Sequence, residues 1–179
     1  MAALVGGSCM SWTSPALPLL QKPDSVPHVT DVEGSWIGSL LNLGAFLGAL
    51  PAGLLADKIG RKVTLCILAI PLTGSWLMIA FGGTVTELFV GRFMGGIAIG
   101  AVSVVTPMYI AEMAESSIRG ALGTLFQLQL TTGILFSYLA GMVGDHRVLS
   151  FISCTLPVLF LITFIWMPES PFYLLSKNR

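Results

Sequence analysis

The chain has 179 residues, with nine lysines and arginines balanced by nine acidic residues, so its formal net charge is zero. Hydrophobic residues make up 54% and charged residues only 10%, against roughly 25% in a soluble domain. The mean hydropathy is +0.85. A soluble fold of this size could not bury so much apolar surface in one core, so we expect an all-α membrane protein. The neutral charge gives no sign of a nucleic-acid partner.

The sequence contains no arrangement of Cys, His or acidic residues that is typical of a metal site, a cofactor site or an enzyme active site. Cys9, Cys66 and Cys154 are far apart in apolar runs, and their spacing matches neither a metal site nor a disulfide framework. His28 and His146 lie in separate expected loops, and no carboxylate cluster occurs inside an apolar segment. We therefore expect no cofactor and no enzymatic activity.

Apolar stretches long enough to cross a bilayer as helices need about 20 residues. We expect six of them, at 2–20, 35–56, 63–82, 86–109, 120–142 and 148–167. The first is rich in small and polar residues, which suits a helix inside a bundle. The first cation is Lys22, so a cleaved signal peptide, which normally begins with positive charge, is not expected.

Orientation follows from the cations between these spans. One side would carry Lys22 and Arg147, and the other a larger set: Lys58, Arg61, Lys62, Arg119, Lys177 and Arg179. Because cytoplasmic loops carry the excess of Lys and Arg, both ends of the chain are expected to be cytoplasmic.

Small residues recur four apart within two of the spans. They are Gly44 and Gly48 in one span, and Gly91, Gly95, Gly96 and Gly100 in another. This spacing places them on helix faces where backbones can approach closely, and helix packing alone is sufficient to explain it.

Four ordered motifs point to a family. The loop between the second and third spans reads Gly53-Leu-Leu-Ala-Asp57-Lys-Ile-Gly60-Arg61-Lys62, which resembles the cytoplasmic signature of the major facilitator superfamily. The other three motifs are Gly91-Arg92 followed by Pro107-Met-Tyr-Ile-Ala-Glu112, Arg119-Gly-Ala-Leu-Gly-Thr-Leu-Phe-Gln127, and Pro168-Glu169-Ser-Pro-Phe-Tyr. Together they resemble the sugar porter family, and in particular its insect trehalose transporters.

The resemblance implies a sugar-binding role for Gln127, since a buried amide suits sugar hydroxyls. Thr13, Asn42 and Thr131 are weaker candidates for lining a sugar site, because such polar side chains often join helices instead. Arg92 lies inside a span, where a cation is costly unless paired or hydrated. In proton-coupled family members the matching arginine neighbours a first-span aspartate; an approximate alignment places Ser8 there, and residues 1–20 contain no acid.

The resemblance also implies a cytoplasmic gate built from Glu112, Arg119 and Glu169 with Arg61. Isolated exposed charges of this kind would contribute at most about 1 kcal/mol per pair. The final motif departs from the family pattern, because Phe172 stands where an arginine is usual. Lys177 or Arg179 could replace that cation.

The resemblance implies half of a twelve-helix fold whose two bundles bind substrate between them. We expect residues 1–167 to form the amino-terminal bundle and 168–179 to begin a cytoplasmic linker, with the carboxy-terminal bundle absent from this chain, which is then a fragment or truncated isoform. The expected function is facilitative transport of glucose or trehalose at the plasma membrane. Two alternatives stay open: a carrier of another small solute, and a non-transporting half protein that regulates full-length carriers.

Overall fold

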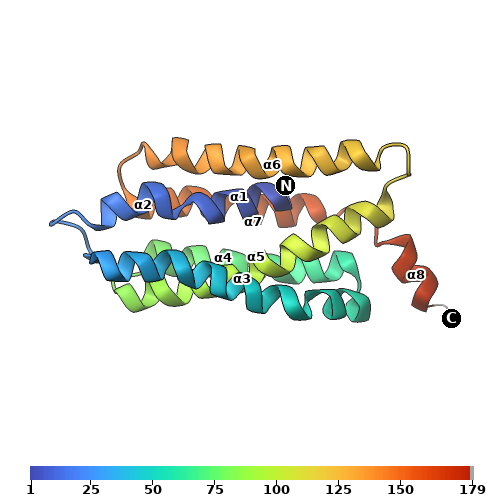
Figure 1. The fold of residues 1–179 in the computed structure, drawn as a ribbon, viewed down its shortest axis with the longest axis horizontal. Coiled ribbons are helices and arrows are strands. Elements are labelled where there is room, and N and C mark those ends of the chain that lie inside the picture. The colour runs from blue at the N-terminus through green and yellow to red at the C-terminus, as the bar shows by residue number, and fades with distance from the viewer. Residues whose placement is uncertain (178–179) are drawn as a thin grey trace.

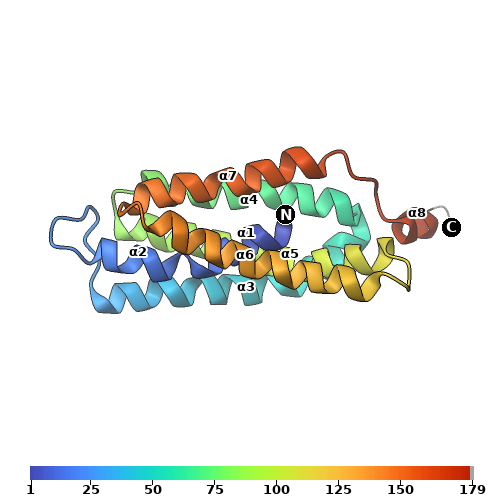
Figure 2. The same cartoon turned by 90° about the horizontal axis from the view of Figure 1, so that it is seen from above.

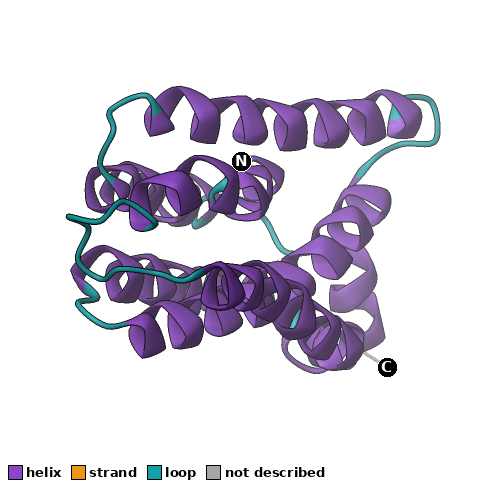
Figure 3. Cartoon of the chain, turned by 60° about the vertical axis from the view of Figure 1, so that its left-hand side comes forward, coloured by secondary structure: helices purple, strands orange, loops and turns teal. Residues whose placement is uncertain are grey.

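The computed structural model describes residues 1–177, and helices account for nearly all of that range (Figure 3). In chain order the helices are α1 (Ala2–Ser11), α2 (Thr13–Leu20), α3 (Asp31–Ile59), α4 (Arg61–Phe81), α5 (Val85–Met113), α6 (Arg119–Gly141), α7 (His146–Phe164) and α8 (Pro171–Lys177). The long helices run along one common axis, and the short α8 lies beyond one end of the bundle (Figure 1).

Four helices in the described range, α3, α4, α5 and α7, are long and apolar enough to cross a membrane. An apolar all-helical bundle is thus confirmed, but the expected count of six spans is not. The expected span 2–20 is divided into α1 and α2. The expected span 120–142 corresponds to α6, whose two glutamines and three threonines lower its hydropathy.

The division of the first span falls at Trp12. Trp12 keeps helical dihedral angles (φ −52°, ψ −36°), and its N–H donates to the Ser8 carbonyl at 3.1 Å. Pro15 has no N–H, so the Ser11 carbonyl loses its helical donor just after this point. α1 therefore continues into α2 with a local irregularity at a proline.

The connections alternate between the two ends of the bundle. The α2–α3, α4–α5 and α6–α7 connections lie at one end, and the α3–α4, α5–α6 and α7–α8 connections lie at the other (Figure 1). At the first end, Thr30 and Thr84 begin α3 and α5 with capping boxes that Glu33 and Glu87 complete. These caps satisfy backbone N–H groups that a helix start would otherwise leave unpaired.

Glycines set the closest helix contacts. A Cβ atom on Gly44 or Gly48 of α3 would collide with the α5 backbone, and one on Gly96 or Gly100 of α5 would collide with the α3 backbone. Gly91 faces the neighbouring helix α4, where Ile79 would meet an added Cβ at 2.8 Å. The small residues therefore serve two different faces of α5, which is the central helix of the bundle.

A second close glycine contact joins α1 and α6, which are far apart in the sequence. Gly7 of α1 and Gly133 of α6 each leave no room for a Cβ against the backbone of the other helix. Seen from above, α7 lies beside α4 while α3 borders the opposite side (Figure 2).

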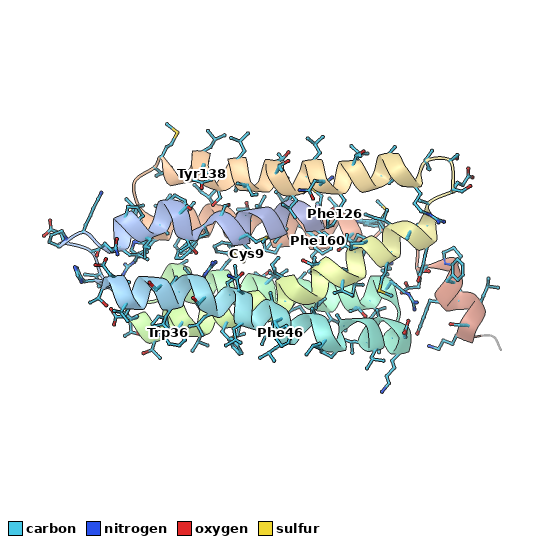
Figure 4. The ribbon with its side chains drawn as sticks, in the orientation of Figure 1. Cys9, Trp36, Phe46, Phe126, Tyr138 and Phe160 are labelled. Carbon is cyan, nitrogen blue, oxygen red and sulfur yellow. The ribbon has the colours of Figure 1, made fainter. Side chains whose placement is uncertain are left out.

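Large apolar side chains cover much of the outside. Figure 4 shows Trp36 and Phe46 along the outer side of α3, and Cys9 inside the bundle. Trp36 and Phe46 are 54% and 63% exposed, whereas Trp12 and Trp76 are buried within the core. An outer surface of this kind suits lipid or a second helical bundle rather than water.

Candidate functional site

Arg92 is the most deeply buried charged residue in the bundle, with 1% of its surface exposed. It sits two turns into α5, and its guanidinium reaches across to two other parts of the fold. Nε donates to the Ile37 carbonyl at 3.3 Å, Nη1 to the Cys9 carbonyl at 2.9 Å, and Nη2 to Thr13 Oγ1 at 2.8 Å. One arginine thus ties α5 to α3 and to the α1–α2 junction, entirely through uncharged oxygens.

Trp12 completes the setting of Arg92. The guanidinium carbon lies 5.2 Å from the centre of the Trp12 ring, a cation–π distance, and Trp12 also packs edge-on against Trp76. Trp12 Nε1 donates to Ser150 Oγ at 3.1 Å. The irregularity at Trp12 therefore aims an aromatic face at the buried cation.

Thr13, rather than Ser8, provides the side-chain partner of Arg92. The alignment that placed Ser8 beside Arg92 is corrected here: the Ser8 hydroxyl has no partner among the described residues, and the Ser8 backbone packs against Gly133 of α6. Ser8 and Thr13 are five residues apart on α1 and α2, so they face different neighbours. Sequence order alone did not resolve which of them reaches α5.

A polar pocket of about 310 Å³ opens between α2 and α3, and Arg92, Thr13 and Asn42 all line it. Gly34 and Gly38 of α3 also line it; a Cβ on Gly38 would lie 3.9 Å from the Thr13 methyl group, and one on Gly34 would collide with Leu17. Two of the residues expected to bind sugar are thus brought together beside the buried arginine.

The other two expected sugar-binding residues lie elsewhere, on the exposed face of α6. Gln127 and Thr131 are both exposed, and the Thr131 hydroxyl donates to the Gln127 carbonyl at 3.2 Å. Gln129 points into the bundle instead and lines a largely apolar cavity of about 360 Å³ between α5, α6 and α7. The described residues therefore hold no single pocket that contains all four candidates.

A second charged site lies at the end of the bundle that carries α8. We call Asp57, Arg61, Glu112, Glu169 and Ser170 the Arg61 cluster. Arg61 Nη2 lies 2.8 Å from Asp57 Oδ1 and 3.0 Å from Glu112 Oε1, and the side chains of Arg61 and Glu112 are only 11% and 17% exposed. The Ser170 hydroxyl donates to the other Glu112 oxygen. Such partly buried, hydrogen-bonded ion pairs are stronger than freely exposed ones.

Glu169 joins the segment after α7 to the α3–α4 turn. Its Oε1 accepts from the backbone N–H of Lys62 and from that of Ser170, both at 2.9 Å. Gly60 makes this possible, since it has φ +101° and a Cβ there would collide with the Glu169 carboxylate. The acid therefore occupies the start of α4, where a negative charge is favourable.

Three residues of this region were not singled out from the sequence. Tyr109 donates its hydroxyl to the Pro168 carbonyl at 2.7 Å, and Tyr173 donates to the Lys58 carbonyl at 3.3 Å. The Arg61 guanidinium lies 5.9 Å from the Tyr173 ring centre. Tyr109, Ser170 and Tyr173 all belong to the quoted motifs, so their position within those motifs was the available signal.

Several predicted gate residues stand outside the cluster. Arg119 is exposed, and within residues 1–177 its side chain donates only to the Ala114 carbonyl, at 3.5 Å, and forms no ion pair. Lys62 contributes its backbone, and Gly53 has no neighbour within 4 Å of an added Cβ. Phe172 is 66% exposed.

Lys177 and Arg179 were the two cations expected to replace the missing family arginine. Lys177 lies 3.3 Å from the Tyr173 hydroxyl and over its ring, rather than against an acid. Arg179 lies outside the described residues.

Apolar helices long enough to cross a membrane, a buried cation and a hydrogen-bonded charge cluster at one end are the features of a multi-pass membrane protein. The Sugar (and other) transporter family profile matches residues 8–179, so the chain belongs to this family. The resemblance to sugar porters is thereby confirmed.

Curated relatives agree with this assignment. The chain is 37% identical over 174 residues to solute carrier family 2, facilitated glucose transporter member 8 of Bos taurus, covering 97% of the chain and 36% of that protein. It is 36% identical over 180 residues to the facilitated trehalose transporter Tret1 of Culex quinquefasciatus, covering 100% and 35%. The chain thus spans about a third of the length of these relatives.

Solved structures agree on the fold. The chain superposes on the xylose transporter XylE from E. coli, in a partially occluded inward-open conformation, with a TM-score of 0.87 and 25% identity, covering 98% of the chain and 48% of that structure. A more distant match is the POT family transporter PepTSo, with a TM-score of 0.72 and 14% identity, covering 95% and 38%.

Proposed function

We propose that this chain is the amino-terminal half of a facilitative sugar transporter that moves glucose or trehalose by alternating access. The names of its glucose- and trehalose-transporting relatives support the choice of substrate. Coverage of about a third of those relatives and about half of the XylE structure supports the assignment to one half.

The contacts of Arg92 are the observation that supports uniport, that is, sugar transport without coupling to protons. A proton-driven cycle requires a group that takes up and releases a proton as access changes. Here all the hydrogen bonds of the buried arginine go to two carbonyls and one hydroxyl. None of these groups titrates in the physiological range, so Arg92 can keep its charge and its contacts throughout the cycle.

The proposal assigns a role to the candidate sugar contacts, to the Arg61 cluster and to the segment after α7. Gln127, Thr131, Thr13 and Asn42 would contact sugar on surfaces that a second bundle completes, with the substrate near the membrane midplane. The Arg61 cluster would stabilise one state of the cycle, with Arg119 free to pair across to the second bundle. Residues 1–167 would form the first bundle, and the segment from Pro168 onward would begin the linker.

We also propose a plasma-membrane location with both ends cytoplasmic. The test is cysteine labelling in intact cells with an impermeant reagent, in a background without Cys9, Cys66 and Cys154. Asp24→Cys should react from outside, and Ser117→Cys should react only after permeabilisation. Labelling of Ser117→Cys in intact cells would show that the chain has the opposite orientation in the membrane.

Substrate uptake tests the function. Oocytes that express the complete reading frame containing this chain should take up labelled glucose or trehalose in a saturable manner, and unlabelled sugar should compete. A carrier of a polyol or an organic anion would show no such competition. A regulatory half protein would carry no flux itself, but would change the flux of a co-expressed full-length carrier.

A further inference from the structure

The positive charge of Arg92 has no negative partner among the described residues. A guanidinium has five N–H donors, and the Arg92 side chain uses three of them on uncharged oxygens. A cation in the apolar part of a membrane protein is costly unless it is paired or reaches water. Two donors and a full positive charge are therefore left for another group.

The pocket beside Arg92 is where such a group can enter. The bond from Nη2 to Thr13 is only partly buried, whereas the bonds from Nε and Nη1 are fully buried. Nη2 and Thr13 thus face the pocket of about 310 Å³ that lies between α2 and α3. Arg92 is thus 1% exposed and borders this pocket with Thr13.

The other walls supply further donors. The Asn42 side chain is exposed and makes no hydrogen bond within residues 1–177, and the Thr13 hydroxyl accepts from Arg92 while its own proton stays available. Ser35 and Ser39 already donate to backbone carbonyls of the preceding turn, at 3.0 and 2.8 Å. Arg92, Thr13 and Asn42 come from three different helices and converge on one space.

Acidic side chains do not compete for this space. The residues that line the pocket include no acid. The nearest acids on α3 are engaged elsewhere: Asp31 accepts from Gln21 at 2.8 Å, and Glu33 caps the helix through Thr30. An anion that enters the pocket would therefore meet Arg92 and no carboxylate among the lining residues.

We propose that this pocket binds a small monovalent anion, held by the Arg92 guanidinium, the Thr13 hydroxyl and the Asn42 amide. A halide and a small carboxylate share the required chemistry, since charge-assisted hydrogen bonds to an arginine are strong for both. The bound anion neutralises Arg92 and joins α2, α3 and α5. The proposal does not rest on sugar transport, and it gives Thr13 and Asn42, which are also candidate sugar contacts, a second ligand in this pocket.

Chloride-35 NMR of the purified chain in detergent tests the proposal. Binding to a slowly tumbling protein broadens the chloride signal, so the wild-type chain should show excess broadening that saturating bromide removes. Acetate distinguishes a site for halides alone from one that also accepts small carboxylates. If acetate displaces chloride, the site also binds a carboxylate; if it does not, the site binds halides.

Variants locate the site. Arg92→Gln should abolish the excess broadening, and Thr13→Val and Asn42→Leu should each reduce it strongly, because each removes one donor with little change in size. Lys22→Gln, which removes an exposed cation of the α2–α3 loop, should leave it unchanged. The melting temperature should also rise with chloride in the wild type and in Lys22→Gln, but not in Asn42→Leu, since a ligand of the folded state stabilises it.

Arg92→Gln can fail to fold, but Thr13→Val and Asn42→Leu keep the proposal falsifiable. Wild-type broadening in both folded variants would overturn it. Absence of broadening in the wild-type chain, or its removal by glucose but by neither bromide nor acetate, would overturn it as well.

Discussion

At the scale of single residues, Gln127 and Arg92 illustrate two ways of placing a polar group in an apolar bundle. Arg92 is buried and donates three hydrogen bonds to neighbouring backbone and side-chain oxygens, so it joins three parts of the bundle from within. Gln127 is exposed on α6 and makes no side-chain hydrogen bond within the described range. An amide left free in this way is available to a substrate or a second bundle.

We expect Gln127→Ala in the complete transporter to raise the KM for sugar without reducing surface expression. Loss of one or two hydrogen bonds to sugar hydroxyls would weaken affinity roughly tenfold, since each is worth about 0.5–1.5 kcal/mol. Sugar uptake and surface biotinylation, measured on the same cells, check this. Reduced surface expression at unchanged KM would show a packing role instead, and Thr132→Ala on the same helix serves as the control.

Gly60→Ala should disrupt the Arg61 cluster. The backbone at Gly60 has φ +101° and ψ 153°, a region that costs a residue with a Cβ about 1–3 kcal/mol, and the new Cβ would push against Glu169. We expect a lower melting temperature of the purified chain. Gly53→Ala is the matched control, because nothing lies within 4 Å of its added Cβ and alanine favours a helix. Equal melting temperatures for the two variants would argue against this account.

At the scale of helices, contact between α3 and α5 depends on the absence of side chains. Gly96 and Gly100 of α5 face the carbonyls of Leu41 and Ala45 of α3, which are backbone groups that cannot rotate away. The pair of helices can widen only by losing the contacts that hold Arg92 near Ile37.

Gly100→Ala should therefore destabilise the bundle by about 1–3 kcal/mol, the usual range for overpacking. Gly74→Ala in α4 adds the same methyl group where no atom lies within 4 Å, and it should be neutral or stabilising. Unfolding of the two variants by a denaturing detergent measures the difference. Similar midpoints would mean that the α3–α5 contact is looser than described.

Sequence reasoning succeeded where composition and motif order decide the outcome, and it was less successful where tertiary contacts decide. Apolarity was sufficient for a helical membrane fold, and the motifs around Arg61, Glu112 and Glu169 were sufficient for the family. The break at Trp12 was not foreseen, although Pro15 offered a signal. Choosing between Ser8 and Thr13 as the partner of Arg92 required the rotation of α1 and α2 relative to α5, and no spacing in the sequence gives that rotation.

At the scale of the whole molecule, the candidate sugar contacts lie at two separate places on the described bundle. One is the face of α6 with Gln127 and Thr131, and the other is the pocket of Thr13, Asn42 and Arg92 between α2 and α3. The chain spans about half of the solved xylose transporter. A second bundle that covers both surfaces would enclose a substrate between two halves, as alternating access requires.

The most direct test of facilitated sugar transport is the final distribution of labelled sugar across a membrane with an imposed proton gradient. The complete transporter, reconstituted in proteoliposomes, should bring the internal and external concentrations of labelled glucose or trehalose to equality, with the same end point with and without the gradient. Accumulation of sugar above the external concentration, abolished by a protonophore, would show proton coupling and would contradict the account.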